Sequence, residues 1–116
     1  MIDLKEYADL LKQRVGIENE KDANWKWNVK SVGKSIAHIG WGYLDYCGGW
    51  GAEKKKTFTI ESKNDDFLGD VLTARHPSGD VITHLVVGGK YKDIDTAENG
   101  IKSIISAIAY CAHSQY

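Results

Sequence analysis

The chain of 116 residues contains four histidines, side chains that can bind metal ions or transfer protons near neutral pH. Zinc sites normally take ligands about two to five residues apart, and these histidines show no such spacing. His38 and His113 lie far apart in the sequence. His76 and His84 share a predicted hairpin, but its register places them on opposite faces of the sheet. Because a pair on opposite faces cannot bind one ion, we predict no metal site.

Cys47 is the best candidate for a nucleophile. Gly48 and Gly49 follow it, and their backbone N–H groups could line an oxyanion site, with His38 or His113 as the base. No third residue that would orient the base can be identified, and small buried cysteines beside tight turns are common. We therefore expect a protein that is not an enzyme.

The remaining chemical signals are carboxylates and glycines. Two carboxylates can act as general acid and base when their environments differ. Asp65 with Asp66, and Asp93 with Asp95, fall in polar loops, where solvent surrounds both members of each pair alike. The segment GGWGAEKKKT at 48–57 lacks the spacing of a phosphate-binding loop. We expect no cofactor.

The location of the protein is predicted from its cysteines and its apolar stretches. Cys47 and Cys111 fit two reduced thiols, and the sequence leaves open whether they pair. The apolar stretch 104–112 is far shorter than the roughly 18 to 20 residues that cross a bilayer. The charged N-terminus lacks the apolar centre of a secretory signal. Unless a leader has been removed, the sequence predicts a cytoplasmic protein with no membrane segment.

Charge restricts the class of partner. The chain has 15 basic and 16 acidic residues, a formal net charge of −1. Proteins that bind nucleic acids normally carry a basic excess, because counterion release from phosphates supplies much of the affinity. Nucleic acid is therefore disfavoured as the main partner.

Glycines and aromatic residues are concentrated in residues 40–51, GWGYLDYCGGWG. Tryptophan and tyrosine dominate the energetics of protein interfaces, and they also line small-molecule pockets. Trp50, between Gly49 and Gly51 on a predicted loop, is the residue that the core needs least, so we expect it to be an exposed anchor. The candidate binding residues are Trp25, Trp41, Tyr43, Tyr46 and Trp50.

Two functions follow from these residues. The first is a small non-enzymatic interaction protein, of the inhibitor, immunity or accessory type. It would bind another macromolecule, or itself as a homodimer, through the aromatic and glycine-rich loop and the adjoining sheet face. The alternative is a small-molecule-binding protein with an aromatic-lined pocket between sheet and helix. Both use contact rather than catalysis.

The first half of the chain predicts a helix followed by strands. Asp3 and Glu6 fit a capping box, an apolar stripe follows, and Gly16 is expected to end the helix. Residues 17–24 are a predicted polar connection, and 25–32 alternate as a half-buried strand. Residues 33–47 can be read as helix or strand. Glycine and aromatic content favour an irregular strand with a bulge there.

The second half predicts three strands and a helix. Residues 55–62 alternate as a strand, and 70–76 and 80–89 form a hairpin in which His76 opposes Val81. The same register sets Ala74 opposite Thr83 and Leu72 opposite Leu85. Asp95 and Glu98 form a second capping box before a helix with a broad isoleucine stripe, made by Ile101, Ile104, Ile105 and Ile108.

Strands that follow one another through short turns make an antiparallel sheet. We therefore predict the α+β class, with one antiparallel sheet of about four to five strands. The N-terminal and C-terminal helices are expected to pack on one face of this sheet. Residues 1–116 are predicted to form a single domain.

Overall fold

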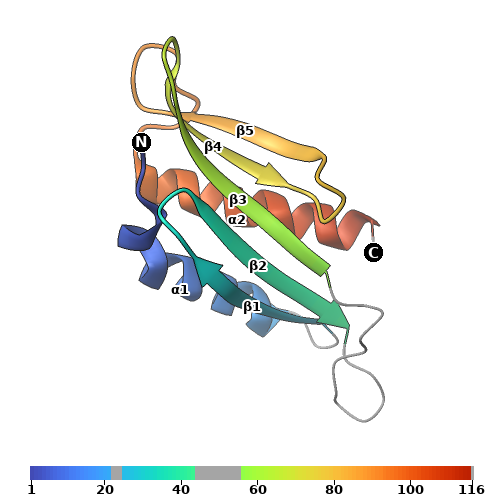
Figure 1. Ribbon diagram of the computed structural model, residues 1–116. Coiled ribbons are helices and arrows are strands. Elements are labelled where there is room, and N and C mark those ends of the chain that lie inside the picture. Colours follow the sequence, from blue (N-terminus) through green and yellow to red (C-terminus); the bar gives the residue numbers. More distant parts are fainter. Residues whose placement is uncertain (22–24, 44–55, 116) are drawn as a thin grey trace.

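The computed structural model of the protein describes residues 1–21, 25–43 and 56–115 (Figure 1). Two helical regions enclose five strands in chain order. The elements are the 3₁₀ helix η1 (Leu4–Tyr7), α1 (Ala8–Lys21), β1 (Trp25–Val32), β2 (Ile36–Tyr43), β3 (Lys56–Asp65), β4 (Gly69–Arg75), β5 (Val81–Val87) and α2 (Ala97–Gln115). Within these ranges, no helix is long and apolar enough to cross a membrane.

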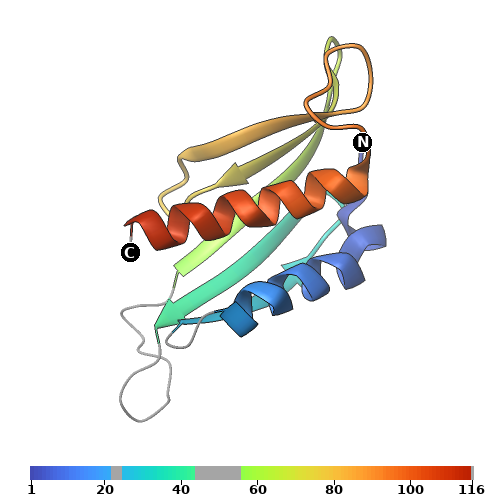
Figure 2. The same cartoon turned by 180° about the vertical axis from the view of Figure 1, so that it is seen from behind.

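The strands form one antiparallel sheet in the order β1-β2-β3-β4-β5, so each strand pairs with its neighbours in sequence. Both α1 and α2 lie on the same face of this sheet (Figure 2). No described element covers the opposite face, which we call the open face. The predicted α+β class and the placement of both helices on one face are confirmed.

The first helix begins as predicted but ends later. Asp3 accepts a hydrogen bond from the Lys5 backbone N–H at 2.9 Å, and the first turn is a 3₁₀ helix. The expectation that Gly16 ends the helix was wrong, because α1 continues to Lys21. A glycine inside a helix costs about 1 kcal/mol relative to alanine, and contacts made by residues 17–21 offset this cost. One of them is the hydrogen bond that Asn19 Oδ1 accepts from the Trp27 backbone N–H at 3.1 Å.

The stretch that could be read as helix or strand contains β2, which pairs with β1 on one side and β3 on the other. The strand interpretation is therefore confirmed over residues 36–43. The bulge lies elsewhere, in β1 between Val29 and Ser31. A bulge leaves one extra residue on its strand, here Lys30.

The hairpin of β4 and β5 has the predicted register in its middle, with Leu72 opposite Leu85 and Ala74 opposite Thr83. At its end the prediction was wrong, because a bulge sets Arg75 opposite Val81.

The turn that closes this hairpin is fixed by two backbone hydrogen bonds. The Gly79 N–H donates to the His76 carbonyl, and the His76 N–H donates to the Asp80 carbonyl, each at 2.8 Å. Gly79 takes a φ of +96°, which glycine adopts without steric cost.

The core lies between the sheet and the two helices. Each of the four predicted isoleucines of α2 is at most 1% exposed, as the apolar stripe required. The N-cap prediction needs correction, since Thr96 Oγ1, rather than Asp95, accepts the hydrogen bond from the Asn99 N–H at 3.2 Å. Asp95 instead pairs with Lys92 at 2.8 Å.

Candidate functional site

A groove lies between the start of β5 and the second half of α2, with a volume of about 590 Å³. We call it the β5–α2 groove. Volumes of this size are typical of small-molecule sites. Its β wall comes from the hairpin turn and β5, and its helical wall from α2. Residues that line it include His76, Asp80, Val81, Ile82, Ala107 and Tyr110.

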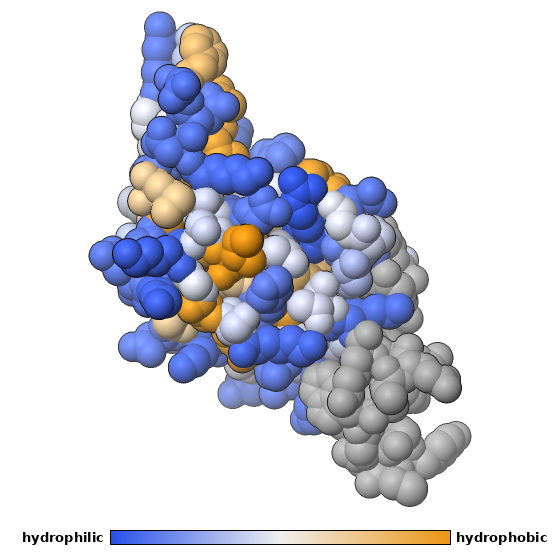
Figure 3. Space-filling model, viewed as in Figure 1, coloured by the Kyte–Doolittle hydropathy of each residue, from blue (hydrophilic) through white to orange (hydrophobic). Residues whose placement is uncertain are grey.

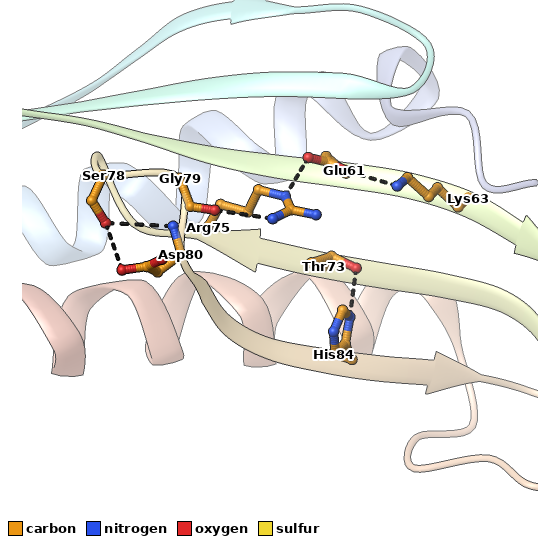
Figure 4. A network of polar contacts seen from close by, with 8 residues as sticks. All are labelled: Glu61, Lys63, Thr73, Arg75, Ser78, Gly79, Asp80 and His84. Atoms are coloured by element: carbon orange, nitrogen blue, oxygen red, sulfur yellow. Dashed lines mark hydrogen bonds and ion pairs between the residues drawn. The ribbon is translucent and has the colours of Figure 1, made fainter.

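The hairpin turn fixes the polar end of the groove. Ser78 Oγ donates a hydrogen bond to Asp80 Oδ2 at 3.2 Å and accepts one from the Asp80 backbone N–H at 3.4 Å (Figure 4). Arg75 Nη1 donates to the Gly79 carbonyl at 3.0 Å, which ties the turn to the open face. The Asp80 carboxylate is therefore held in place beside the groove.

The helical wall carries no aspartate, glutamate, lysine or arginine among the described residues. Tyr110 is 77% exposed, unlike the isoleucines on the opposite side of the same helix. Cys111, which also lines the groove, is buried, and burial raises the pKa of its thiol. The sulfur is thus a neutral thiol near neutral pH, and this wall offers no activated thiolate.

A polar network occupies the open face (Figure 4). Glu61 accepts a hydrogen bond from Arg75 Nε at 2.6 Å and forms an ion pair with Lys63 at 3.2 Å. Burial alone would raise the pKa of Glu61, but the hydrogen bonds and charges of Arg75 and Lys63 together lower it. Thr73 Oγ1 and His84 Nδ1 share a hydrogen bond of 2.9 Å on the same face.

Four of these residues, Lys63, Thr73, Arg75 and His84, line a second, smaller groove of about 390 Å³, which Val71 and Val86 also line. Figure 3 shows the open face, with apolar side chains near its middle among hydrophilic ones. Arg75, Lys63, Thr73 and His84 are each engaged by a neighbouring side chain. The network is therefore satisfied internally, as a stabilising arrangement requires.

An exposed pair of aromatic rings lies beyond the end of β3. Phe67 and Tyr91 stack with their ring centroids 5.0 Å apart and an interplanar angle of 23°, although they are 73% and 47% exposed. Asp65 Oδ1 accepts hydrogen bonds from the backbone N–H groups of Phe67 and Leu68, at 2.9 and 2.8 Å. These bonds lower the pKa of Asp65 and fix the turn that presents the Phe67 ring.

Of the five predicted binding residues, Trp41 is the one whose side chain the structure describes. Trp41 is 1% exposed and packs with its ring centroid 5.7 Å from that of Trp27 and 6.3 Å from that of Phe58. The expectation that Trp41 contacts a partner therefore needs correction, because a covered core side chain has no surface to offer. Trp25 and Tyr43 are backbone partners at the ends of β1 and β2.

Tyr46, Trp50 and the candidate nucleophile Cys47 lie outside the described residues.

The aromatic residues that the structure does expose were not singled out from the sequence. A signal for them exists. Phe67 and Tyr91 stand alone among polar turn residues, in DDFLGD and GGKYKD, and Tyr110 falls on the side of the helix away from the isoleucine stripe. An aromatic residue in a polar connection, or on the side of a helix opposite its apolar stripe, is poorly placed to join a core.

His76 and His84 contact different faces of the sheet, although the register predicted at His76 was wrong. The partly buried His76 ring packs against the core residue Phe58, with centroids 5.8 Å apart, whereas His84 shares a hydrogen bond with Thr73 on the open face. Over the described ranges, no group of three or more histidine, cysteine, aspartate or glutamate side chains could hold a metal ion.

Comparison with known proteins gives no likeness. No protein-family model matches the chain, and no curated protein or solved structure is significantly similar to it.

Proposed function

We propose that the protein is a small binding protein that recognises another macromolecule, or a second copy of itself, and does not catalyse a reaction. The observation that carries this proposal is the stacked and exposed pair of Phe67 and Tyr91. A role as an inhibitor, immunity or accessory protein of the cytoplasm belongs to the same proposal. So does a second contact region at Trp25, Tyr43, Tyr46 and Trp50.

Exposed aromatic rings favour binding most when they are already held in place. Large aromatic side chains are enriched among the residues that dominate interface energies. Ordering a flexible side chain on binding costs about 0.5 to 1.5 kcal/mol. The Phe67 ring is held by the turn around Asp65 and by the Tyr91 ring, and Lys90 Nζ lies 5.6 Å from the Tyr91 centroid. The pair is thus preorganised for contact.

Charge around the pair favours a protein over a polyanion. The two segments that carry the rings, 63–70 and 88–95, contain Lys63, Lys90 and Lys92 against Asp65, Asp66, Asp70, Asp93 and Asp95. An acidic excess repels phosphates, whereas mixed charges at the rim of an aromatic centre are usual in protein interfaces.

The test compares Phe67→Ser with Tyr110→Ser, which removes an equally exposed ring from another surface. Affinity capture from cells of the source, with quantitative mass spectrometry, would identify partners of the wild-type chain, and light scattering over a dilution series would detect self-association. We expect Phe67→Ser to weaken the main interaction about tenfold or more, because truncating a central interface aromatic commonly costs 2 kcal/mol or above. Tyr110→Ser should leave it unchanged.

A chain that stays monomeric at every concentration and retains the same proteins with and without Phe67 would contradict the proposal. Circular dichroism of both variants would establish that neither result reflects loss of the fold.

A second candidate function has its own observation. The β5–α2 groove lies between sheet and helix and includes the Tyr110 ring, which favours the binding of a small molecule. The small-molecule alternative drawn from the sequence also lies between sheet and helix, and Tyr110 is the aromatic residue that supports it in this groove.

A further inference from the structure

We infer that the β5–α2 groove binds a small amphipathic molecule that joins an apolar body to a positively charged amine, with Asp80 as the anchor of the amine. This inference rests on the second candidate function and names the chemical class of its ligand.

The apolar body is required by the walls of the groove. Val81 and Ile82 from β5 face Ala107 from α2, and the Tyr110 ring forms part of the helical side. Val81 is 43% exposed, so its side chain still presents apolar surface to water. Covering such surface contributes about 25 cal/mol for each Å² removed from water. The small Ala107 side chain keeps the groove open where a larger residue would fill it.

The carboxylate of Asp80 favours a positively charged ligand. Among the described residues that line the groove, Asp80 is the only aspartate, glutamate, lysine or arginine, and His76 is the only histidine. No cation of the described residues forms an ion pair with its carboxylate. Arg75, the cation of the same hairpin, is bound to Glu61 at 2.6 Å on the open face. A ligand amine therefore meets a carboxylate that no described cation neutralises.

The hydrogen bonds of the turn set the direction of this carboxylate. Ser78 donates to Oδ2 of Asp80, which leaves the other carboxylate oxygen to accept a hydrogen bond from an ammonium group. Apart from the His76 ring and the Tyr110 hydroxyl, the remaining polar groups of the lining are neutral: the hydroxyls of Ser78, Thr83 and Ser114 and the Cys111 thiol. They neither repel a cation nor attract an anion.

The experiment uses three probes that share one aryl-ethyl body and differ in charge: 2-phenylethylamine, 2-phenylethanol and 3-phenylpropionate. Binding to the full chain would be measured by isothermal titration calorimetry, with ¹H–¹⁵N NMR to locate the contacts. We expect the amine to bind about three- to five-fold more tightly than the alcohol, the range of a solvent-exposed ion pair, and the acid to bind most weakly. NMR shifts should fall on residues 76–83 and 107–114.

Three variants separate the parts of the inference. Asp80→Asn should bind the amine no better than the alcohol, and Asp66→Asn, an exposed aspartate away from the groove, should behave as wild type. Ala107→Phe fills the groove and should abolish binding of every probe. If it does not fold, judged by circular dichroism, Tyr110→Ser replaces it and should weaken all probes.

The outcomes test the ligand class separately from the small-molecule-binding function on which it rests. Equal binding of amine and alcohol, lost in Ala107→Phe, would overturn the role of Asp80 and leave the small-molecule function standing. Absence of binding by all three probes, or NMR shifts elsewhere on the molecule, would overturn both.

Discussion

Glu61 illustrates how one side chain can organise the open face. The Glu61 carboxylate accepts a hydrogen bond from Arg75 of β4 and forms an ion pair with Lys63 of its own strand, β3. The Glu61 side chain is only 16% exposed. A charge-assisted hydrogen bond to a side chain that is largely shielded from water contributes more to stability than an ion pair in open solvent. The lowered pKa of Glu61 records the same preference for the ionised form.

Glu61→Gln should therefore destabilise the protein by about 1 kcal/mol at neutral pH. Because the pKa of Glu61 is lowered in the folded state, its contribution is complete above the unfolded-state pKa, about 4.3. It is lost as the pH falls through the folded-state value. The difference between wild type and Glu61→Gln should thus shrink in acid. Urea unfolding at neutral pH and near pH 3 checks this.

Asp66→Asn is the control for that measurement, since Asp66 is an exposed carboxylate that forms no ion pair with another described residue. A destabilisation by Glu61→Gln that stays the same from neutral to acid pH would show that the carboxylate charge is not what matters.

Trp41 shows what a residue pattern leaves undecided. Alternation along β2 places Ile39 and Trp41 on one side of the strand, and both side chains are buried. A period of two gives two sides, however, and does not say which one the helices cover. In the structure Trp41 faces the helices, and its glycine neighbours Gly40 and Gly42 face the other way. Composition suggested a binding surface at a position that packing assigns to the core.

At the scale of elements, two helical glycines have opposite surroundings. A Cβ atom on Gly100 in α2 would lie 3.1 Å from both Leu72 Cδ1 and Val87 Cγ2, so this glycine lets the helix approach β4 and β5 closely. Gly16 in α1 has no atom within 4 Å of the same position.

Gly100→Val should therefore destabilise the protein by about 1 to 3 kcal/mol, because extra methyl groups in a packed contact force the helix away from the sheet. Gly16→Ala is its matched counterpart and should stabilise the protein by roughly 0.5 to 1 kcal/mol through helix propensity alone. Thermal and urea unfolding of both variants give these differences. A neutral Gly100→Val would mean that the helix and sheet are less closely packed than the structure shows.

Helices and strands were predictable where an apolar period extends over many residues. The prediction was wrong where a contact between two elements determines the end of an element or its register. The isoleucine stripe of α2 and the alternation of β3 identified those elements from local sequence. The end of α1 could not be found locally, since Asn19 is kept helical by its bond to Trp27 in a different element. The hairpin register was right until the bulge at Arg75, which depends on the backbone of a turn rather than on side-chain type.

At the scale of the whole molecule, the sequence order of the elements was enough to predict the architecture. Short connections between successive strands impose neighbouring antiparallel pairs, and helices at both ends need an apolar surface to cover. The binding surfaces were not predictable in this way. The β5–α2 groove joins residues 76–83 to residues 107–114, and the aromatic pair joins Phe67 to Tyr91, so each exists only after the chain has folded.

One hydrophobic cluster spans every part of this architecture, which predicts that the protein unfolds as a single cooperative unit. The cluster includes Leu4 of η1, Leu11 of α1, Trp27 and Trp41 of β1 and β2, Phe58 of β3, Leu72 of β4, Val87 of β5 and Ile108 of α2. Urea curves can be followed by tryptophan fluorescence, to which Trp25 and Trp27 of β1 and Trp41 of β2 contribute, and by far-ultraviolet circular dichroism, which reports largely on the helices. The two curves should coincide. Ile108→Ala, which opens a cavity between helix and sheet, should shift both curves together by about 2 to 5 kcal/mol. Two separate transitions, or a shift in the helical signal alone, would divide the chain into units that fold independently and would remove the basis for treating residues 1–116 as one domain.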